Sequence, residues 1–477
     1  MEDKRYLKWY NKVGYGSGDI AGNVVYAFLS SFVMIYLTNS IGLSAGIVGT
    51  LIAVSKLFDG VTDVFFGAMI DKTHSSFGKA RPWMLYGYVG CAVTLIAIFA
   101  IPADISTTAQ YAWFFIAYTM LNAVFYTANN IAYSALTSLC TTNSKERVQM
   151  GSCRFIFAFA TSLLIQSLTV GFVADCGGGA QAWRLVAVCY ALIGLIINTI
   201  SCLSVRELSE EELIKSEERE TGGQPAEKYG LIEAVRLLAA NKFYLMICGV
   251  YILQQLYSAM INAGIYYMTY VLKNETLYGV FSWAVNIPLI AALILTPTLV
   301  GKWKGLYKLN LRGYMLAAAG RLFVVAAAYL GSIPLMLLFT ALAAFGQGPW
   351  QGDMNAVIAS CSEYTFLTKG KRVDGTMYSC TSLGTKLGGG LGTAVSGWLL
   401  EISGFSGTLA VQPDSCIRML HFMYLWLPFL LNILILFILS KMKVEETNEK
   451  IKKEMAVSAP YACRGCGDDG FMIKKGQ

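Results

Sequence analysis

Charged residues are scarce in this chain. Asp, Glu, Lys and Arg make up 14% of its 477 residues, whereas they make up about 25% of a typical soluble domain. Hydrophobic residues account for 55% of the sequence, and no soluble domain could keep this much apolar surface away from water. The shortage of charge therefore excludes a soluble globular protein and indicates a chain that lies largely within a membrane.

Histidine is rarer still, and motifs for catalysis or nucleotide binding are missing. The chain has two histidines, His74 and His421, and it contains neither a phosphate-binding loop after a strand nor a serine-hydrolase elbow. Cys463 and Cys466 form one CxxC motif, but a structural zinc site usually has four ligands, and no second pair lies nearby. We therefore expect no enzyme, no cofactor and no bound metal except a transported cation such as Na⁺.

Long apolar stretches are abundant. A helix needs about 20 apolar residues to cross a bilayer, and the sequence predicts twelve such segments. They lie near residues 20–39, 45–70, 83–103, 110–138, 153–174, 183–205, 243–271, 277–299, 314–331, 334–352, 377–403 and 419–440. The first is already long enough to span the membrane and follows a polar N-terminus, so we expect no cleavable signal peptide.

Basic residues predict the orientation of the chain. If both termini are cytoplasmic, nearly all of the 37 Lys and Arg residues fall in cytoplasmic segments, and only Arg184, Lys273 and Arg418 fall outside. This asymmetry follows the positive-inside rule. Loops beside anionic lipid then explain the net charge of +7, which is no evidence for nucleic-acid binding. We expect a multi-pass protein of the cell membrane.

A polar, glutamate-rich segment at about 206–229 divides the predicted helices into two sets of six. Such an arrangement is typical of duplicated transporters, in which the substrate passes between the halves near the bilayer midplane. We predict an N-terminal half at 1–205, a cytoplasmic linker at 206–240, a C-terminal half at 241–441 and a cytoplasmic tail at 442–477. The fold class is an all-α membrane protein with twelve transmembrane helices in two six-helix halves.

The second apolar segment carries three charged residues, Lys56, Asp59 and Asp63, and their spacing places them on one face of a helix. A charge at mid-bilayer costs about 2.5–3.5 kcal/mol, so this face must meet protein, water or an ion. Two carboxylates about 5 Å apart repel by about 3 kcal/mol at an effective dielectric of 20, which favours a bound proton or small cation. Thr62 and Thr127 offer neutral oxygens. Alternatively, Lys56 pairs with one acid and serves packing alone.

Polar and aromatic residues on other segments suit a sugar, because rings cover its apolar faces and amides pair with its hydroxyls. The alternative is that these side chains join helices to one another. Lys386 lies among Gly384, Gly388 and Gly392, a spacing that favours close helix packing. Arg154 suits a carboxylate or a pair of hydroxyls, and it equally suits a cytoplasmic helix edge. The polar and aromatic candidates are Tyr126, Asn129, Asn130 and Tyr133, then Tyr251, Gln255, Ser258, Asn262 and Tyr266, then Gln347, Trp350, Gln351, Asp353 and Asn355.

Several motifs resemble the glycoside–pentoside–hexuronide:cation symporters, a family typified by the melibiose carrier. The loop from Gly67 to Arg81 resembles the cytoplasmic loop motif of the wider major facilitator superfamily, in which charged residues, here including Asp71, lock helix ends together. The motifs of the symporter family lie in both halves of the chain, at residues 14–19, 38–44, 56–63, 71–83 and 370–386.

The resemblance implies that Asp59 and Asp63 bind the coupling cation, with Thr62 and Thr127 at matching positions. It implies sugar-binding or coupling roles for Arg154 and Lys386. We add Tyr133 and Trp350 as candidate sugar ligands, and Lys56, Asp71 and Lys386 as candidate coupling residues.

The chain also departs from the melibiose carrier. Asn23 and Asn130 stand where that carrier has sugar-binding aspartates, Ser134 replaces a tryptophan, and Ser360 lies where another aspartate is expected. Because two carboxylates are lost while Arg154 and Lys386 remain, an anionic sugar such as a hexuronide or glucuronide is one hypothesis.

The sequence therefore predicts a monomeric secondary transporter that moves a sugar or glycoside with Na⁺ or H⁺. Two alternatives remain. One is a facilitator or exporter of another small polar solute with the same fold, and the other is a sensor that binds its ligand without transporting it.

Overall fold

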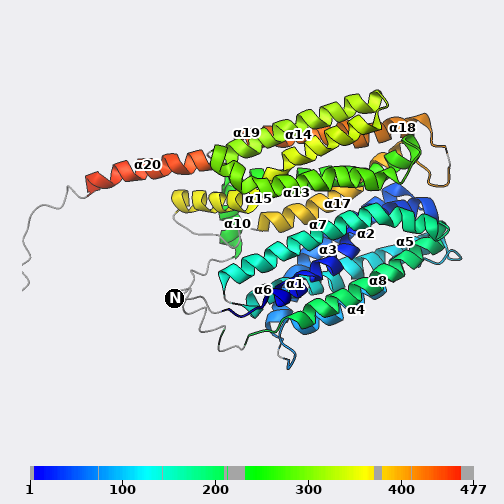
Figure 1. The fold of residues 1–477 in the computed structure, drawn as a ribbon, viewed down its shortest axis with the longest axis horizontal. Helices are drawn as coiled ribbons and strands as arrows, with labels where there is room; N and C mark the ends of the chain where they lie inside the picture. Colours follow the sequence, from blue (N-terminus) through cyan, green and yellow to red (C-terminus); the bar gives the residue numbers. More distant parts are fainter. Residues whose placement is uncertain are drawn as a thin grey trace, which may run out of the picture.

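The computed structural model describes residues 5–73, 75–141, 143–208, 212, 231–303, 305–369, 379–409 and 411–462, and all regular elements in these residues are helical. Figure 1 shows the helices running roughly parallel, with α10 and α20 at one end of the bundle, here called the terminal end. The all-α prediction is confirmed. The Cys463–Cys466 motif, His74 and most of the linker lie outside the described residues.

The N-terminal half is built from helices that pack mainly with one another. The contacts of α2 with α7 and α8, and of α4 with α8, are the most extensive. The elements are α1 (Trp9–Gly16), α2 (Gly18–Ile35), the π-helical η1 (Tyr36–Ile41), α3 (Ala45–Asp71), α4 (Arg81–Ile98), α5 (Thr107–Thr119), the π-helical η2 (Met120–Tyr126), α6 (Thr127–Cys140), α7 (Ser144–Asp175) and α8 (Gly179–Ser204).

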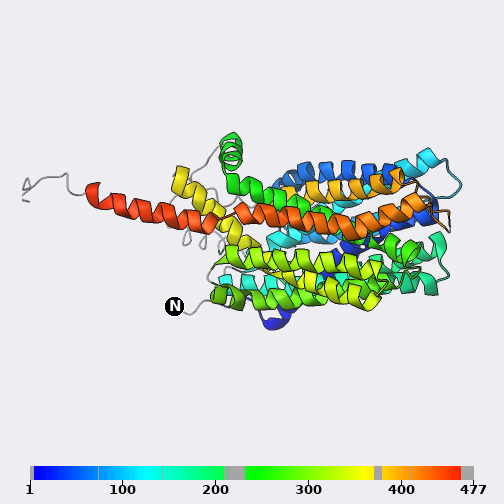
Figure 2. The same cartoon turned by 90° about the horizontal axis from the view of Figure 1, so that it is seen from above.

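The C-terminal half packs in the same manner, with α15 against α13 and α14 and with α11 against α19. Its elements are α10 (Leu231–Ala240), α11 (Lys242–Asn262), α12 (Gly264–Tyr266), the π-helical η3 (Tyr267–Val271), α13 (Leu277–Trp303), α14 (Leu306–Tyr329), α15 (Ile333–Lys369), α17 (Ser379–Ile402), α18 (Asp414–His421), the π-helical η4 (Phe422–Trp426), α19 (Leu427–Lys441) and α20 (Val444–Ala462). Figure 2 shows α20 extending away from the bundle.

Nine helical stretches of the described chain are long and apolar enough to span a membrane, so the chain is a multi-pass membrane protein. The other three predicted segments, near 45–70, 110–138 and 377–403, are also helical, as α3, as the continuous run α5–η2–α6, and as α17. The total of twelve spans stays a prediction.

The two halves meet through α3 against α17 and through α7 against α13. At the end opposite the termini, the hydroxyl groups of Thr38 and Tyr266 lie 2.9 Å apart, and Ser44 donates to Glu401 at 2.7 Å. Gly397 packs so closely on the carbonyl of Ala45 that a Cβ atom would not fit. These contacts close the bundle at that end.

The start of α4 is fixed by a carboxylate from the segment that follows α8, the helix packed against α4. Glu207 accepts hydrogen bonds from the backbone N–H groups of Lys79, Ala80 and Arg81, at 2.7, 3.0 and 3.0 Å. The first N–H groups of a helix have no partner within it, and its N-terminus attracts negative charge. Glu207 therefore ties the loop after α3, where the cytoplasmic motif was predicted, to the end of α8.

Candidate functional site

A central cavity of about 440 Å³ lies between the two halves. It falls within the 300–1,000 Å³ that is usual for small-molecule sites. Its walls come from α2 and α3, from the run α5–η2–α6, and from α11 and α17. The three predicted segments that are not among the nine apolar stretches, α3, α5–η2–α6 and α17, therefore all contribute side chains to this cavity.

One wall of the cavity carries the charged residues Lys56 and Asp59 of α3. The Lys56 ammonium lies 3.2 Å from Asp59 Oδ2 and 3.2 Å from the amide oxygen of Asn122 on η2. Asp59 is only 5% exposed, and its second carboxylate oxygen, Oδ1, is buried without a hydrogen-bond partner. A buried acceptor without a partner is unusual, so this oxygen is the strongest candidate for an ion ligand.

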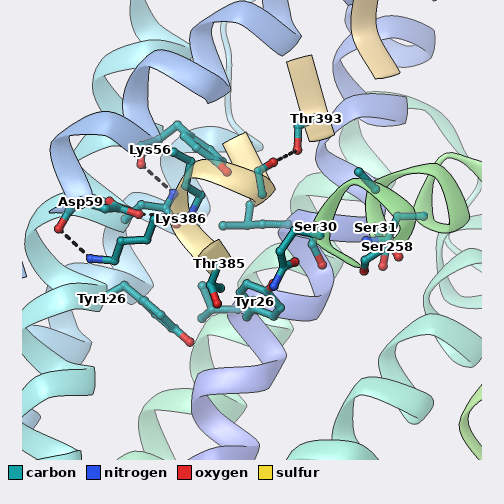
Figure 3. Close-up of a pocket in the computed structure, with 18 of the residues that line it drawn as sticks. Tyr26, Ser30, Ser31, Lys56, Asp59, Tyr126, Ser258, Thr385, Lys386 and Thr393 are labelled. Carbon is teal, nitrogen blue, oxygen red and sulfur yellow. Dashed lines mark hydrogen bonds and ion pairs between the residues drawn. The ribbon is translucent and has the colours of Figure 1, made fainter. Parts of the chain in front are cut away.

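Lys386 reaches the same wall from the other half. Its ammonium donates to the backbone carbonyl of Asp59 at 2.8 Å, and Figure 3 shows Lys386, Lys56 and Asp59 close together. Gly388 and Gly392 pack directly on α11, and Gly390 packs on Lys56. The glycines around Lys386 thus allow α17 to lie tightly between α11 and α3.

The two predicted threonine ligands use their hydroxyl protons within their own helical runs. Thr127 lines the cavity and donates to the carbonyl of Asn122 at 2.9 Å. Thr62 donates to the carbonyls of Phe58 and Asp59, both at 3.2 Å. Their oxygen lone pairs remain available to a cation. Asp63 and Asp71 belong to α3, but their side chains lie outside the described part of the structure.

Arg154 forms an ion pair that the sequence did not reveal. Its Nε lies 2.6 Å from Asp19 Oδ2, and its guanidinium stacks over the ring of Tyr133, 4.2 Å from the centroid. The Tyr133 hydroxyl donates to the same aspartate at 3.2 Å and to the carbonyl of Tyr15 at 2.8 Å. Because Asp19 balances Arg154, the hypothesis of an anionic substrate loses one of its two premises.

Two other predicted sugar ligands lie away from the central cavity wall. Asn23 donates to the carbonyl of Asp19 at 2.9 Å and accepts from Ser162 at 3.2 Å, so it joins α2 to α7. Trp350 is fully buried among apolar side chains of the C-terminal half. By contrast, Asn130 lines the cavity as expected.

Sequence reasoning missed two cavity residues of α2, Tyr26 and Ser30, which Figure 3 shows beside the cavity. Their i, i+4 spacing is a weak polar signal inside an apolar segment. Sequence reasoning also gave no role to Asp19, which ends the 14–19 motif just before the first predicted span. Gln255, Ser258 and Asn262 of the α11 stripe do line the cavity.

Comparisons with known proteins agree with this architecture. The profile of the family described as "MFS/sugar transport protein" matches residues 14–446. An uncharacterized symporter, YnaJ, of Bacillus subtilis is 30% identical over 88% of both chains. The isoprimeverose transporter of Lactiplantibacillus pentosus is 26% identical over 89% of this chain and 86% of its own. The glucuronide carrier protein homolog of Escherichia coli is 26% identical over 86% of this chain and 87% of its own.

Solved structures show the same fold. A D-xylose-proton symporter superimposes with a TM-score of 0.63 at 15% identity, covering 91% of this chain and 97% of its own. The xylose transporter XylE of E. coli, in a partially occluded inward-open conformation, gives 0.56 at 16% identity over the same shares. The predicted major facilitator fold is confirmed.

Proposed function

Because the chain belongs to the MFS/sugar transport protein family, we propose that it carries a sugar or glycoside across the cell membrane together with a monovalent cation. This membership confirms the resemblance to glycoside–pentoside–hexuronide:cation symporters. The observation that carries the proposal is the central cavity, which combines hydroxyl, amide and tyrosine groups on several walls with the partly buried Lys56–Asp59 pair on another.

The uncharged walls suit a sugar. Tyr26 and Tyr126 offer ring faces and hydroxyl groups, while Asn130, Gln255 and Asn262 offer amides that both donate and accept. Asn130, Gln255 and Asn262 make no side-chain hydrogen bond to the described protein, so they are free to pair with substrate hydroxyls. Because Lys56 and Arg154 are each paired to an aspartate, we propose a neutral sugar or glycoside as the substrate. Lys386 on the cavity wall leaves a hexuronide as the alternative.

The Lys56–Asp59 pair suits cation coupling. A proton on Asp59 or a Na⁺ beside its free Oδ1 would compete with the Lys56 ammonium for the carboxylate. Within the described residues, no three His, Cys, Asp or Glu side chains lie together as a metal site would require. A Na⁺ at this position would therefore take its further ligands from neutral oxygens such as those of Thr127 and Thr62.

The closed end of the bundle bears on which conformation of the transport cycle the structure represents. If both termini are cytoplasmic, as predicted, the contacts of Thr38 with Tyr266 and of Ser44 with Glu401 lie on the outer side, which supports an inward-facing state. Transport then requires the two halves to rock about the cavity. The cation drives this step only to the extent that it binds one state more tightly than the other.

The test is uptake into membrane vesicles. Labelled neutral glycosides, isoprimeverose among them, and a glucuronide with its neutral parent would be offered under a Na⁺ gradient or a proton gradient imposed separately. Accumulation of one sugar under one gradient would support the proposal and identify the ion. Uptake of the glucuronide in preference to its parent would reject the neutral substrate. No accumulation by folded, inserted protein would reject import and favour an exporter or a sensor.

A further inference from the structure

A second cavity, of about 200 Å³, lies inside the C-terminal half. Helices α11, α13, α14, α15 and α19 surround it, and Gln166 of α7 reaches its edge. Each water takes about 30 Å³ in the liquid, so the space is several times larger than one water. It is smaller than the usual site for a complete small-molecule ligand, about 300–1,000 Å³.

Many residues that line this second cavity carry polar groups, and none of them is charged. Thirteen of the eighteen residues that line it carry an amide, hydroxyl or phenol group, and such groups pair with sugar hydroxyls. These polar residues are Gln166, Gln254, Tyr257, Ser258, Asn262, Tyr278, Ser282, Asn286, Tyr314, Gln347, Gln351, Tyr424 and Asn432.

Several of these groups are left without partners. The amide nitrogen of Asn432, a fully buried residue, donates to nothing in the described protein, and the side chains of Gln351 and Asn262 make no hydrogen bond there. Leaving a buried donor unpaired costs about 1–3 kcal/mol. A ligand with hydroxyl groups would satisfy the Asn432 donor in a way that the protein does not.

Two tyrosines of the wall are also prepared to donate. Tyr257 accepts a hydrogen bond from Arg321 Nε at 2.8 Å, and Tyr314 accepts one from Gln254 at 2.7 Å. Because each phenol oxygen already accepts from a neighbouring side chain, its proton is available for an acceptor in the cavity.

The second cavity adjoins the central one along α11. Ser258 and Asn262 line both, while Gln255 faces only the central cavity and Gln254 faces only the second. Figure 3 shows Ser258 among the residues that line the central cavity. Because Ser258 and Asn262 line both cavities, the two cavities lie side by side along α11.

We propose that the second cavity is a subsite for an additional uncharged sugar ring of a glycoside whose first ring occupies the central cavity. This inference rests on the proposed function, since it concerns the same substrate. The transported glycoside would then be at least a disaccharide, and selectivity for its second ring would come from Asn432, Gln351 and their neighbours.

The test compares two neutral glycosides that share the same first sugar, a methyl glycoside and a disaccharide. Their binding to the purified full-length protein is measured by isothermal titration calorimetry. Gln351→Leu should weaken disaccharide binding about fivefold, as expected for the loss of one hydrogen bond of about 1 kcal/mol, and leave the methyl glycoside unchanged. Asn432→Leu should act in the same direction, and Gln255→Leu, in the central cavity, should weaken both sugars.

The outcomes separate the subsite from the proposed function. If the wild-type protein binds the disaccharide and methyl glycoside but Gln351→Leu and Asn432→Leu change both equally, or change neither, the subsite is rejected while sugar binding stands. A cavity that holds only structural water would give this result. If the wild-type protein binds neither glycoside, both the subsite and the neutral-sugar function are rejected.

Discussion

The ammonium group of Lys386 donates to the backbone carbonyl of Asp59 at 2.8 Å, and the two residues come from opposite halves of the chain. The same aspartate holds Lys56 through its carboxylate. A change at the Asp59 carboxylate, by a proton or a Na⁺, thus occurs directly at a junction between the halves. Coupling needs such a link, because an ion can drive transport only through a difference in its affinity for two states.

Asp59→Asn should abolish cation-driven accumulation of sugar and spare downhill exchange. The amide keeps the size of the side chain and the backbone carbonyl that Lys386 contacts, but it removes the charge that holds a cation. The measurement is uptake into vesicles with an imposed gradient, alongside exchange without one.

A matched control is Asp353→Asn, because Asp353 is buried in α15 and binds Asn310 away from the central cavity. That variant should keep its cation dependence. Gradient-driven accumulation by Asp59→Asn would show that the coupling ion binds elsewhere.

Arg154 and Asp19 should behave as a coupled pair. Removing one partner of a partly buried ion pair leaves the other charge uncompensated, so Arg154→Gln and Asp19→Asn should each lower the unfolding temperature. The double variant should lose less stability than the sum of the single losses, with a coupling energy of about 1–3 kcal/mol. Thermal unfolding of the four proteins in detergent gives this value, and additive losses would contradict the pairing.

Glu207→Ala should loosen the start of α4. The variant loses three hydrogen bonds from backbone N–H groups, and the loss of a helix cap costs about 1–2 kcal/mol. We expect a lower unfolding temperature and faster proteolysis in the 72–80 loop. Glu275→Ala, an exposed glutamate at the other end of the bundle, is the control and should change neither. Equal protease resistance of Glu207→Ala and wild type would show that the Glu207 hydrogen bonds do not stabilise the start of α4.

Glu146, at the terminal end, predicts a pH dependence. Burial alone would raise its pKa, but the hydrogen bonds from Thr141 and from the N–H groups of Leu7 and Tyr6, together with Lys12, outweigh burial and lower it below the ordinary 4.5. A lowered pKa means that the carboxylate stabilises the folded protein above pH 4.5 and that this contribution disappears as the pH falls through the lowered value.

The check is the unfolding temperature of wild type and Glu146→Gln between pH 7 and pH 3. The variant should be less stable at pH 7, and the difference should shrink below pH 4.5. A difference that stays constant down to pH 3 would mean that the Glu146 charge contributes nothing.

The helices and the charged face of α3 could be predicted from sequence because both depend on local patterns. Apolar runs of membrane-spanning length are visible in the chain itself, and the i, i+3 spacing of Lys56 and Asp59 places them together on any helix. The resulting pair, 3.2 Å apart, is therefore a local consequence of the sequence.

Contacts between different helices could not be predicted from local sequence patterns. Arg154 and Asp19 are 135 residues apart, and only the packing of α7 on α2 brings them to 2.6 Å. Trp350 has the chemistry of a sugar platform, but the rotation of α15 buries it completely. The second cavity forms only where five helices meet. In the sequence, its amide residues lie on separate helices and so could not be recognised as one site.

At the closed end, the way in which the two halves touch affects how easily they can separate. At Gly397 the backbone of one half lies directly on that of the other, without an intervening side chain. Long side chains lose rotamer freedom each time a contact forms and regain it when the contact breaks, whereas glycine has none to lose. Where Gly397 meets Ala45, the two halves can therefore separate and meet again without reordering a side chain, while the contacts of Thr38 with Tyr266 and of Ser44 with Glu401 must break and re-form.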